Sequence, residues 1–198
     1  MVETLSDYIE QGRLQLFCVD SVDRESWSDK EGNPRYRAEM QEKWFNYITN
    51  EIVPFIHNYT GRKDLIVTGC SMGGTHAGIS FFRRPDLFET LIALSGAFDA
   101  SMFFGNYMDD LVYNNSPVHF LRNMPEDHYY LDIYRNKKII LCIGQGAWEE
   151  DLLPSNHEMN AILKEKNVPA WVDFWGYDVA HDWNWWQLQI RYFMDKVL

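Results

Sequence analysis

The sequence is poor in cysteine and in positive charge. Its three cysteines, Cys18, Cys70 and Cys142, show no spacing typical of a zinc site or a disulfide framework. Lysines and arginines number 18 against 29 aspartates and glutamates, so the formal net charge is −11, and the basic residues form no run. Because nucleic-acid affinity rests largely on lysine and arginine at phosphates, this argues against a nucleic-acid partner. We expect no metal and no nucleic acid.

Long apolar runs are missing as well. No stretch approaches the ~20 residues that a membrane-spanning helix requires, and the start, Met1-Val2-Glu3-Thr4, is acidic, unlike a secretory signal. We therefore expect a cytoplasmic protein with no membrane partner. Repeats, low-complexity tracts and linkers are also absent. A length of 198 residues with 46% apolar composition suits one well-buried domain, which we expect to span residues 1–198.

What the chain does contain is an alternation of strands and helices. Short apolar runs predict strands at 14–19, 65–68, 91–94, 138–143 and 171–175. Helical spacing of apolar residues predicts helices at 3–11, 36–57, 75–82 and 183–197, and a capping box predicts one that starts at Ser155. Residues 97–136 should form a less regular excursion with one or two short helices. This order predicts an α/β fold, a parallel sheet with helices on both faces.

The most informative segment is Gly69-Cys70-Ser71-Met72-Gly73-Gly74. It follows a predicted strand and opens a predicted helix, the context of a nucleophile elbow with the pattern G-x-S-x-G. Such a turn is tight enough to force Ser71 into a strained backbone conformation, and glycines at 69 and 73 would leave it room. The alternative is an ordinary glycine-rich turn between a strand and a helix.

A serine hydroxyl is a weak nucleophile unless a base removes its proton and a third group orients that base. In open parallel sheets, the chemistry lies on loops at the carboxyl ends of strands. Of the six histidines, His181 alone follows a predicted strand beyond the candidate acids, so we expect it to be the base. His76 opens the elbow helix and more simply packs or caps. The others lie in helical or irregular segments: His57, His119, His128 and His157.

The orienting acid is expected in the loop after the strand at 138–143, where Glu149, Glu150 and Asp151 are adjacent. The spacing to His181 favours Glu150, with Glu149 and Asp151 as rivals. Asp99, after the preceding strand, is a separate candidate. Three adjacent acids also commonly form a solvated helix start, where negative charge is favourable.

With serine, acid loop and histidine in this order, the chain resembles the esterase branch of the α/β-hydrolases. The nearest likeness is to esterases related to esterase D and to the feruloyl-esterase type of carbohydrate esterase. It rests on the segments 69–74, 144–151 and 181–183.

The resemblance implies Ser71 as nucleophile, His181 as base and a carboxylate among 149–151 as orienter. It also implies the backbone N–H of Met72 as an oxyanion donor. The implied reaction is hydrolysis of a small carboxylic ester through an acyl-enzyme, without a cofactor. The alternative is a non-catalytic binding protein of the same fold, or an inactive shortened relic.

The chain departs from this family at its front end, because it opens with the helix at 3–11 and no strand or HGGG-like segment precedes it. We therefore expect an α/β-hydrolase-like sheet that is shortened at the amino terminus. A missing second oxyanion donor would cost on the order of 10²–10³ in rate. A missing central strand would leave backbone unpaired, which keeps homo-oligomerisation open.

Eight tryptophans, five of them between 171 and 186, need an explanation. Trp171 and Trp175 alternate on the last predicted strand and should pack under the final helix. Trp183 and Trp186 fit the buried stripe of that helix. Trp148 and Trp185 are the better candidates for an aromatic wall at the site.

Overall fold

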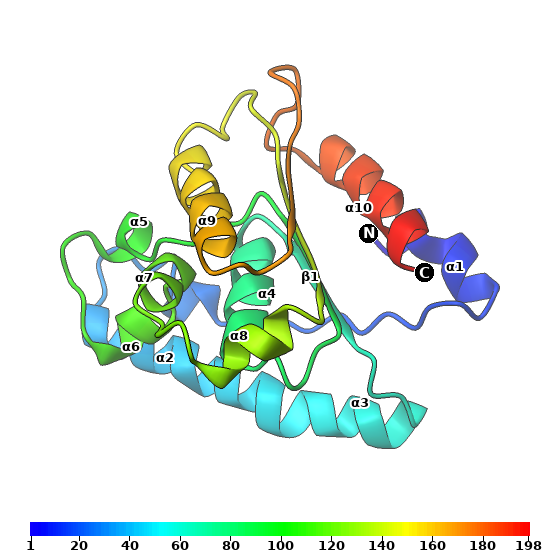
Figure 1. Ribbon diagram of the computed structural model, residues 1–198, viewed down its shortest axis with the longest axis horizontal. Coiled ribbons are helices and arrows are strands. Elements are labelled where there is room, and N and C mark those ends of the chain that lie inside the picture. Colours follow the sequence, from blue (N-terminus) through cyan, green and yellow to red (C-terminus); the bar gives the residue numbers. More distant parts are fainter.

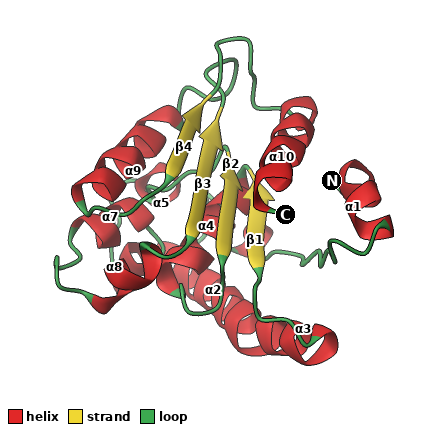
Figure 2. Ribbon diagram, turned by 45° about the vertical axis from the view of Figure 1, so that its right-hand side comes forward, coloured by secondary structure: helices red, strands yellow, loops and turns green.

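The computed structural model describes all 198 residues and contains one four-stranded parallel sheet. Its strands lie side by side in chain order (Figure 2): β1 (Ile66–Cys70), β2 (Thr90–Leu94), β3 (Lys138–Ile143) and β4 (Trp171–Phe174). Each pair is parallel. The predicted α/β fold with a parallel sheet is confirmed.

Ten α-helices surround the sheet: α1 (Ser6–Glu10), α2 (Pro34–Tyr47), α3 (Val53–Thr60), α4 (Met72–Arg83), α5 (Ser101–Phe104), α6 (Asp110–Asn114), α7 (Pro117–Arg122), α8 (Tyr129–Tyr134), α9 (Leu153–Glu165) and α10 (Trp183–Val197). A π-helical turn, Ile48–Ile52, joins α2 to α3, so the long helix predicted at 36–57 is continuous. Short 3₁₀ turns occur at Glu3–Leu5 and Asp23–Glu25. None of the helices has the length and apolarity to cross a bilayer.

The helices cover both faces of the sheet. Successive strands step the same way across it, and parallel crossovers are right-handed, so the connecting helices α4, α7, α8 and α9 fall on one face. Helix α10, after the last strand, packs with α1 on the other face (Figures 1 and 2). Both faces are therefore closed by apolar side chains.

Side chains of the central strands alternate between two cores. Leu91 and Ala93 of β2 join the core under the connecting helices, together with Ile139 and Leu141 of β3. The intervening residues Ile92, Leu94, Ile140 and Cys142 join the core under α1 and α10. All eight are at most 4% exposed. This two-sided burial explains why both strands read as continuous apolar runs rather than as alternating ones.

The strand predicted at Leu14–Val19 is wrong. Residues 14–22 belong to no helix or strand, and the backbone N–H groups from Gln15 to Asp20 donate no hydrogen bond. The apolar side chains of Leu14 and Leu16 nonetheless pack against the core under α10. Cys18, in the same segment, is exposed. The short apolar run correctly indicated a segment that packs partly on the core, but a strand also needs a hydrogen-bonded partner.

Two helix predictions also need correction. Helix α9 begins at Leu153 with Pro154 in its first turn, so Ser155 lies inside the helix instead of capping it. The Ser155 hydroxyl donates to the carbonyl oxygen of Leu152 and accepts from the N–H of Phe98. The excursion at 97–136 contains four short helices, α5 to α8, where one or two were expected.

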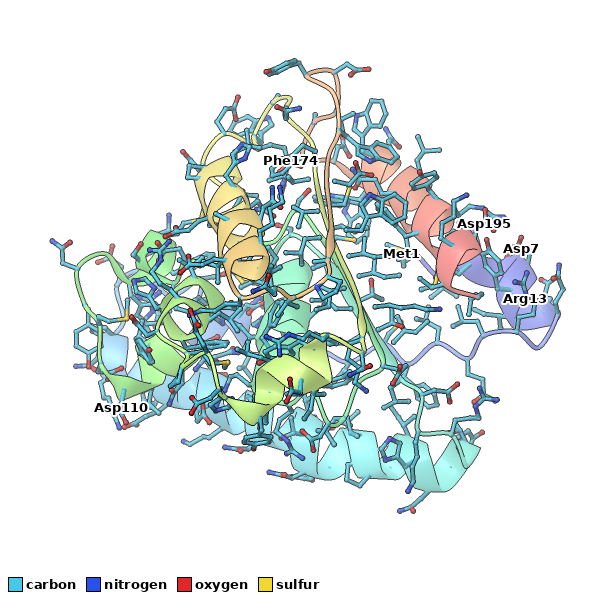
Figure 3. All side chains as sticks on the ribbon, in the orientation of Figure 1. Met1, Asp7, Arg13, Asp110, Phe174 and Asp195 are labelled. Carbon is cyan, nitrogen blue, oxygen red and sulfur yellow. The ribbon has the colours of Figure 1, made fainter.

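Helix α10 makes polar contacts with α1 and aromatic contacts with Trp171 and Trp175. Arg191 donates to both carboxylate oxygens of Asp7 on α1 at 2.8 Å, and the Tyr8 hydroxyl donates to Asp195. Figure 3 labels Asp7 and Asp195 on the two helices. Trp171 and Trp175 pack against Tyr192 of the same helix, as predicted. Trp186 is buried, but Trp183 is 55% exposed, so its predicted place in the buried stripe is wrong.

Candidate active site

The expected site residues converge at one edge of the sheet. Ser71 directly follows β1, and His181 lies on the loop after β4, which we call the histidine loop (residues 175–182). Glu149 lies on the loop after β3, the acid loop (residues 144–152). Because parallel strands all end at the same edge, three segments far apart in the sequence meet there.

Ser71 occupies the tight turn between β1 and α4, with φ 54° and ψ −122°. A positive φ is unusual for a residue with a side chain and costs energy that the surrounding packing must supply. A methyl group on Gly69 would lie 2.2 Å from the carbonyl oxygen of Gly73, and one on Gly74 would lie 2.7 Å from that of Leu94. Gly73 has open space around it, so our expectation that it relieves crowding is wrong; Gly74 does so instead.

Ser71, His181 and Glu149 form a continuous hydrogen-bonded chain. The Ser71 hydroxyl lies 2.8 Å from Nε2 of His181, and Nδ1 of His181 lies 2.9 Å from Oε2 of Glu149. A carboxylate only accepts, so the hydrogen-bond network places a proton on Nδ1 and leaves Nε2 free to accept the serine proton. The imidazole also packs edge-on against Trp186, with the ring centres 4.7 Å apart.

The carboxylate that contacts His181 is Glu149, not Glu150 as we expected. Glu149 is 1% exposed, whereas Glu150 and Asp151 are exposed and make no hydrogen bond to the histidine. The reason is a sharp turn at Trp148, whose φ of 71° directs the next side chain inward. In such a turn, neighbouring side chains point in different directions, and spacing along the chain does not reveal which one points inward.

The acid loop and the histidine loop are joined along their backbones. The N–H of Gly146 donates to the carbonyl oxygen of Val179, and the N–H of His181 donates to that of Ala147. Methyl groups on Gly144 and Gly146 would lie 2.1 and 2.8 Å from the carbonyl oxygen of Val179. The two glycines therefore permit the close approach that brings Glu149 to His181.

A small cleft of about 170 Å³ opens beside Ser71. Its apolar side chains come from the start of α4, from α5, from Ala97 and from the acid loop. The lining residues are Ser71, Met72, Thr75, Ser95, Ala97, Met102, Phe103, Trp148, Asp151, Leu152 and His181. Trp148 is 81% exposed and stands at this cleft, whereas Trp185 is not part of the wall.

The backbone N–H of Met72 is the first of α4 and donates no backbone hydrogen bond. Helix N-termini carry unpaired donors and a partial positive charge, which suit an oxyanion. Met72 as an oxyanion donor remains a prediction. No group of three His, Cys, Asp or Glu side chains is placed to hold a metal ion.

The remaining candidates lie elsewhere. Asp99 caps its own turn at Ser101 and lies 3.7 Å from His119, not near His181.

His76 contacts Asp23 at 2.7 Å and lies against Trp44. Of the other three histidines, His128 caps α8, His157 stacks on Phe174, and His57 lies in the last turn of α3.

Cys70 precedes the candidate nucleophile, yet it is not a competing one. Burial raises the pKa of its thiol to about 12, so the thiol stays protonated at neutral pH. A protonated thiol is a poor nucleophile, and this side chain packs against the core under α10.

The fold and the strained serine turn define an α/β-hydrolase. The chain matches the family described as "Putative esterase" over residues 2–192, and it belongs to that family. No curated protein matches the sequence.

Three solved structures show the same fold. A ferulic acid esterase shares 22% identity at a TM-score of 0.61, with 77% of this chain and 59% of that chain covered. The fluorophosphonate-binding serine hydrolase FphF of Staphylococcus aureus shares 20% at 0.58, with 76% and 62% covered. The S-formylglutathione hydrolase FrmB of Staphylococcus aureus shares 20% at 0.58, with 81% and 64% covered. The chain thus spans less than two thirds of the length of each.

Proposed function

We propose that this chain is a serine esterase that hydrolyses a small carboxylic ester through an acyl-enzyme intermediate. The observation that carries the proposal is the unbroken chain from Ser71 through His181 to a buried Glu149, with the serine on a strained turn. Membership of an esterase family supports it. Ser71 would be the nucleophile, His181 the general base and then general acid, and Glu149 the orienting acid.

In the first half-reaction, the Ser71 oxygen attacks the ester carbonyl carbon while Nε2 of His181 takes the hydroxyl proton. The developing oxyanion faces the N–H of Met72 at the start of α4. Collapse of the tetrahedral intermediate breaks the bond to the alcohol, which receives the proton from His181. In the second half-reaction, water gives its proton to His181 and attacks the acyl-enzyme, releasing the acid and restoring Ser71.

The size and lining of the cleft support a small, uncharged acyl group. Its volume of about 170 Å³ is well below the ~300–1,000 Å³ typical of sites for drug-sized ligands. Met102, Phe103 and Leu152 supply apolar contacts, and the lining contains no lysine or arginine. A carboxylate on the acyl group would therefore find no cation, and Asp151 at the same cleft would repel it.

Labelling with a fluorophosphonate probe tests the proposal, because phosphonylation requires an activated serine. We expect the folded protein to gain one adduct, which mass spectrometry locates on Ser71. The adduct should be absent in Ser71→Ala and strongly reduced in His181→Ala, with circular dichroism showing that both variants fold. Folded wild-type protein that stays unlabelled would contradict the proposal and favour a non-catalytic binding protein.

A further inference from the structure

Ser95 follows β2 directly and is a buried polar residue that the reaction described above does not use. It is 0% exposed, and its φ of 50° lies in the left-handed region that residues with side chains rarely adopt. Its N–H donates to the carbonyl oxygen of Cys142 at 2.7 Å, so β3 still holds it. A strained conformation of this kind persists only where the surroundings impose it.

The surroundings of Ser95 are rigid backbone. A methyl group on Gly96 would lie 2.9 Å from the carbonyl carbon of Gly74, in the first turn of α4. The side-chain amide of Asn156 on α9 donates to the carbonyl oxygen of Gly96 at 2.8 Å. The turn that carries Ser95 is thus fixed between the elbow helix and α9, and its hydroxyl has a defined position.

That hydroxyl connects two buried groups. Nε1 of Trp186 lies 3.0 Å from the Ser95 oxygen, and the same oxygen lies 2.6 Å from Oε1 of Glu149. An indole N–H can only donate, so the Ser95 oxygen accepts from Trp186. A carboxylate can only accept, so the single Ser95 proton points to Glu149. The direction of both hydrogen bonds is therefore determined.

Glu149 is consequently held at both of its oxygens. Oε1 accepts from Ser95, and Oε2 accepts from Nδ1 of His181. The last torsion of a glutamate side chain has broad, shallow preferences, so a carboxylate held at one oxygen alone can rotate. The bond from Ser95 removes that freedom, in a site from which burial excludes water.

We propose that Ser95 and Trp186 are positioning residues for the triad: through the hydroxyl of Ser95 they fix the plane of the Glu149 carboxylate. That plane sets the orientation of His181, and Trp186 also packs against the imidazole ring edge-on. The proposal rests on the proposed esterase function. Neither residue touches the reacting atoms; each acts through Glu149 and His181.

The test compares Ser95→Ala and Trp186→Phe with the wild type, using p-nitrophenyl acetate as substrate. Ser95→Ala removes the hydroxyl, and we expect kcat to fall on the order of 10²-fold while KM changes less than about twofold. Trp186→Phe keeps an aromatic ring beside His181 but loses the N–H, so kcat should fall about two- to tenfold. Ser80→Ala is the matched control, because Ser80 is a buried serine of α4 whose hydroxyl makes no hydrogen bond.

A second measurement requires no turnover. The proton on Nδ1 of His181 gives a signal in the downfield region of the proton NMR spectrum. The loss of this signal in His181→Ala identifies it. Its exchange with water should be slow in the wild type and in Ser80→Ala, and clearly faster in Ser95→Ala. If Ser95→Ala fails to fold, Ser95→Gly replaces it, because glycine accepts a φ of 50° and also lacks the hydroxyl.

Wild-type kcat in both variants, together with unchanged exchange of the His181 proton, would overturn the positioning role. Equal rises in KM and falls in kcat would point to a general distortion and would also contradict it. Failure of the esterase proposal is distinguishable, because the wild type itself would then leave the ester and the fluorophosphonate unreacted. The NMR comparison would still report whether Ser95 orders the histidine.

Discussion

A methyl group on Gly144 would lie 2.1 Å from the carbonyl oxygen of Val179. The acid loop and the histidine loop therefore approach this closely at position 144 only because it has no side chain, as at Gly146. The contact lies outside the cleft, but it sets the distance between Glu149 and His181. The geometry of the triad thus depends on a glycine that takes no part in chemistry.

We expect Gly144→Ala to separate the two loops. Overpacking against backbone costs about 1–3 kcal/mol, which corresponds to a fall in Tm of roughly 3–10 °C for a domain of this size. Activity should fall by more than the loss of folded protein explains, because Glu149 moves away from His181. Thermal unfolding and ester hydrolysis, both measured on the purified variant, test this expectation.

Gly73→Ala is the matched control for stability. A methyl group there meets no atom within 4 Å, and alanine is favoured over glycine inside a helix by about 0.5–1 kcal/mol. Its Tm should equal or exceed that of the wild type. A Gly144→Ala variant as stable as Gly73→Ala would show that the loops do not pack as described.

The assignment of the acid gives the second prediction. Glu149→Gln keeps the shape of the side chain but removes the charge that orients the imidazole, so kcat should fall on the order of 10³–10⁴-fold. Glu150→Gln makes the same chemical change one residue further on, at an exposed position. It should leave kcat within about twofold of the wild type. The reverse result, with Glu150 essential and Glu149 dispensable, would restore our expectation from the sequence.

The sequence was sufficient to predict the serine and the histidine that meet in the structure, because each lies on the segment that follows a strand. Such loops must end at the same edge of the sheet, so topology alone brings them together. The choice among three adjacent acids required the turn at Trp148, whose positive φ no local pattern indicates. Ser95 was missed for a related reason: a single serine after a strand carries no signal until its partners are known.

The pair formed by Asp23 and His76 gives a prediction on pH. Burial alone would raise the pKa of Asp23, but the hydrogen bonds from His76 and Ser21 outweigh it and lower this pKa below its ordinary value of 3.8. A group with a lowered pKa in the folded state adds stability at pH values above its unfolded pKa. That contribution disappears as the pH falls through about 4 and below.

We therefore expect Asp23→Asn to lower the free energy of unfolding by about 1 kcal/mol at pH 7. The difference from the wild type should shrink as the pH falls below about 4, where Asp23 itself becomes protonated. Asp127→Asn is the control, because Asp127 is exposed and makes no hydrogen bond or ion pair. Urea unfolding at several pH values measures both. A difference that stays constant down to pH 2 would contradict the link to protonation of Asp23.

The segment from Gln15 to Asp20 shows why an apolar pattern alone does not make a strand. Its side chains pack partly on the core under α10, but its backbone N–H groups donate no hydrogen bond. Amide protons exchange slowly only where they are hydrogen-bonded and shielded from water. We therefore expect these amides to exchange with solvent deuterium within seconds to minutes, on the scale of local opening.

Strand β2 is the internal reference, because all five of its residues are buried and it pairs on both sides. Its amides should exchange only through global unfolding, and so be slower by several orders of magnitude. Hydrogen–deuterium exchange with mass spectrometry on peptides covering 14–21 and 90–95 measures the contrast in one sample. Protection of Gln15 to Asp20 equal to that of β2 would require a backbone partner for this segment. In that case the segment would be a paired strand, and the strand predicted at 14–19 would be restored.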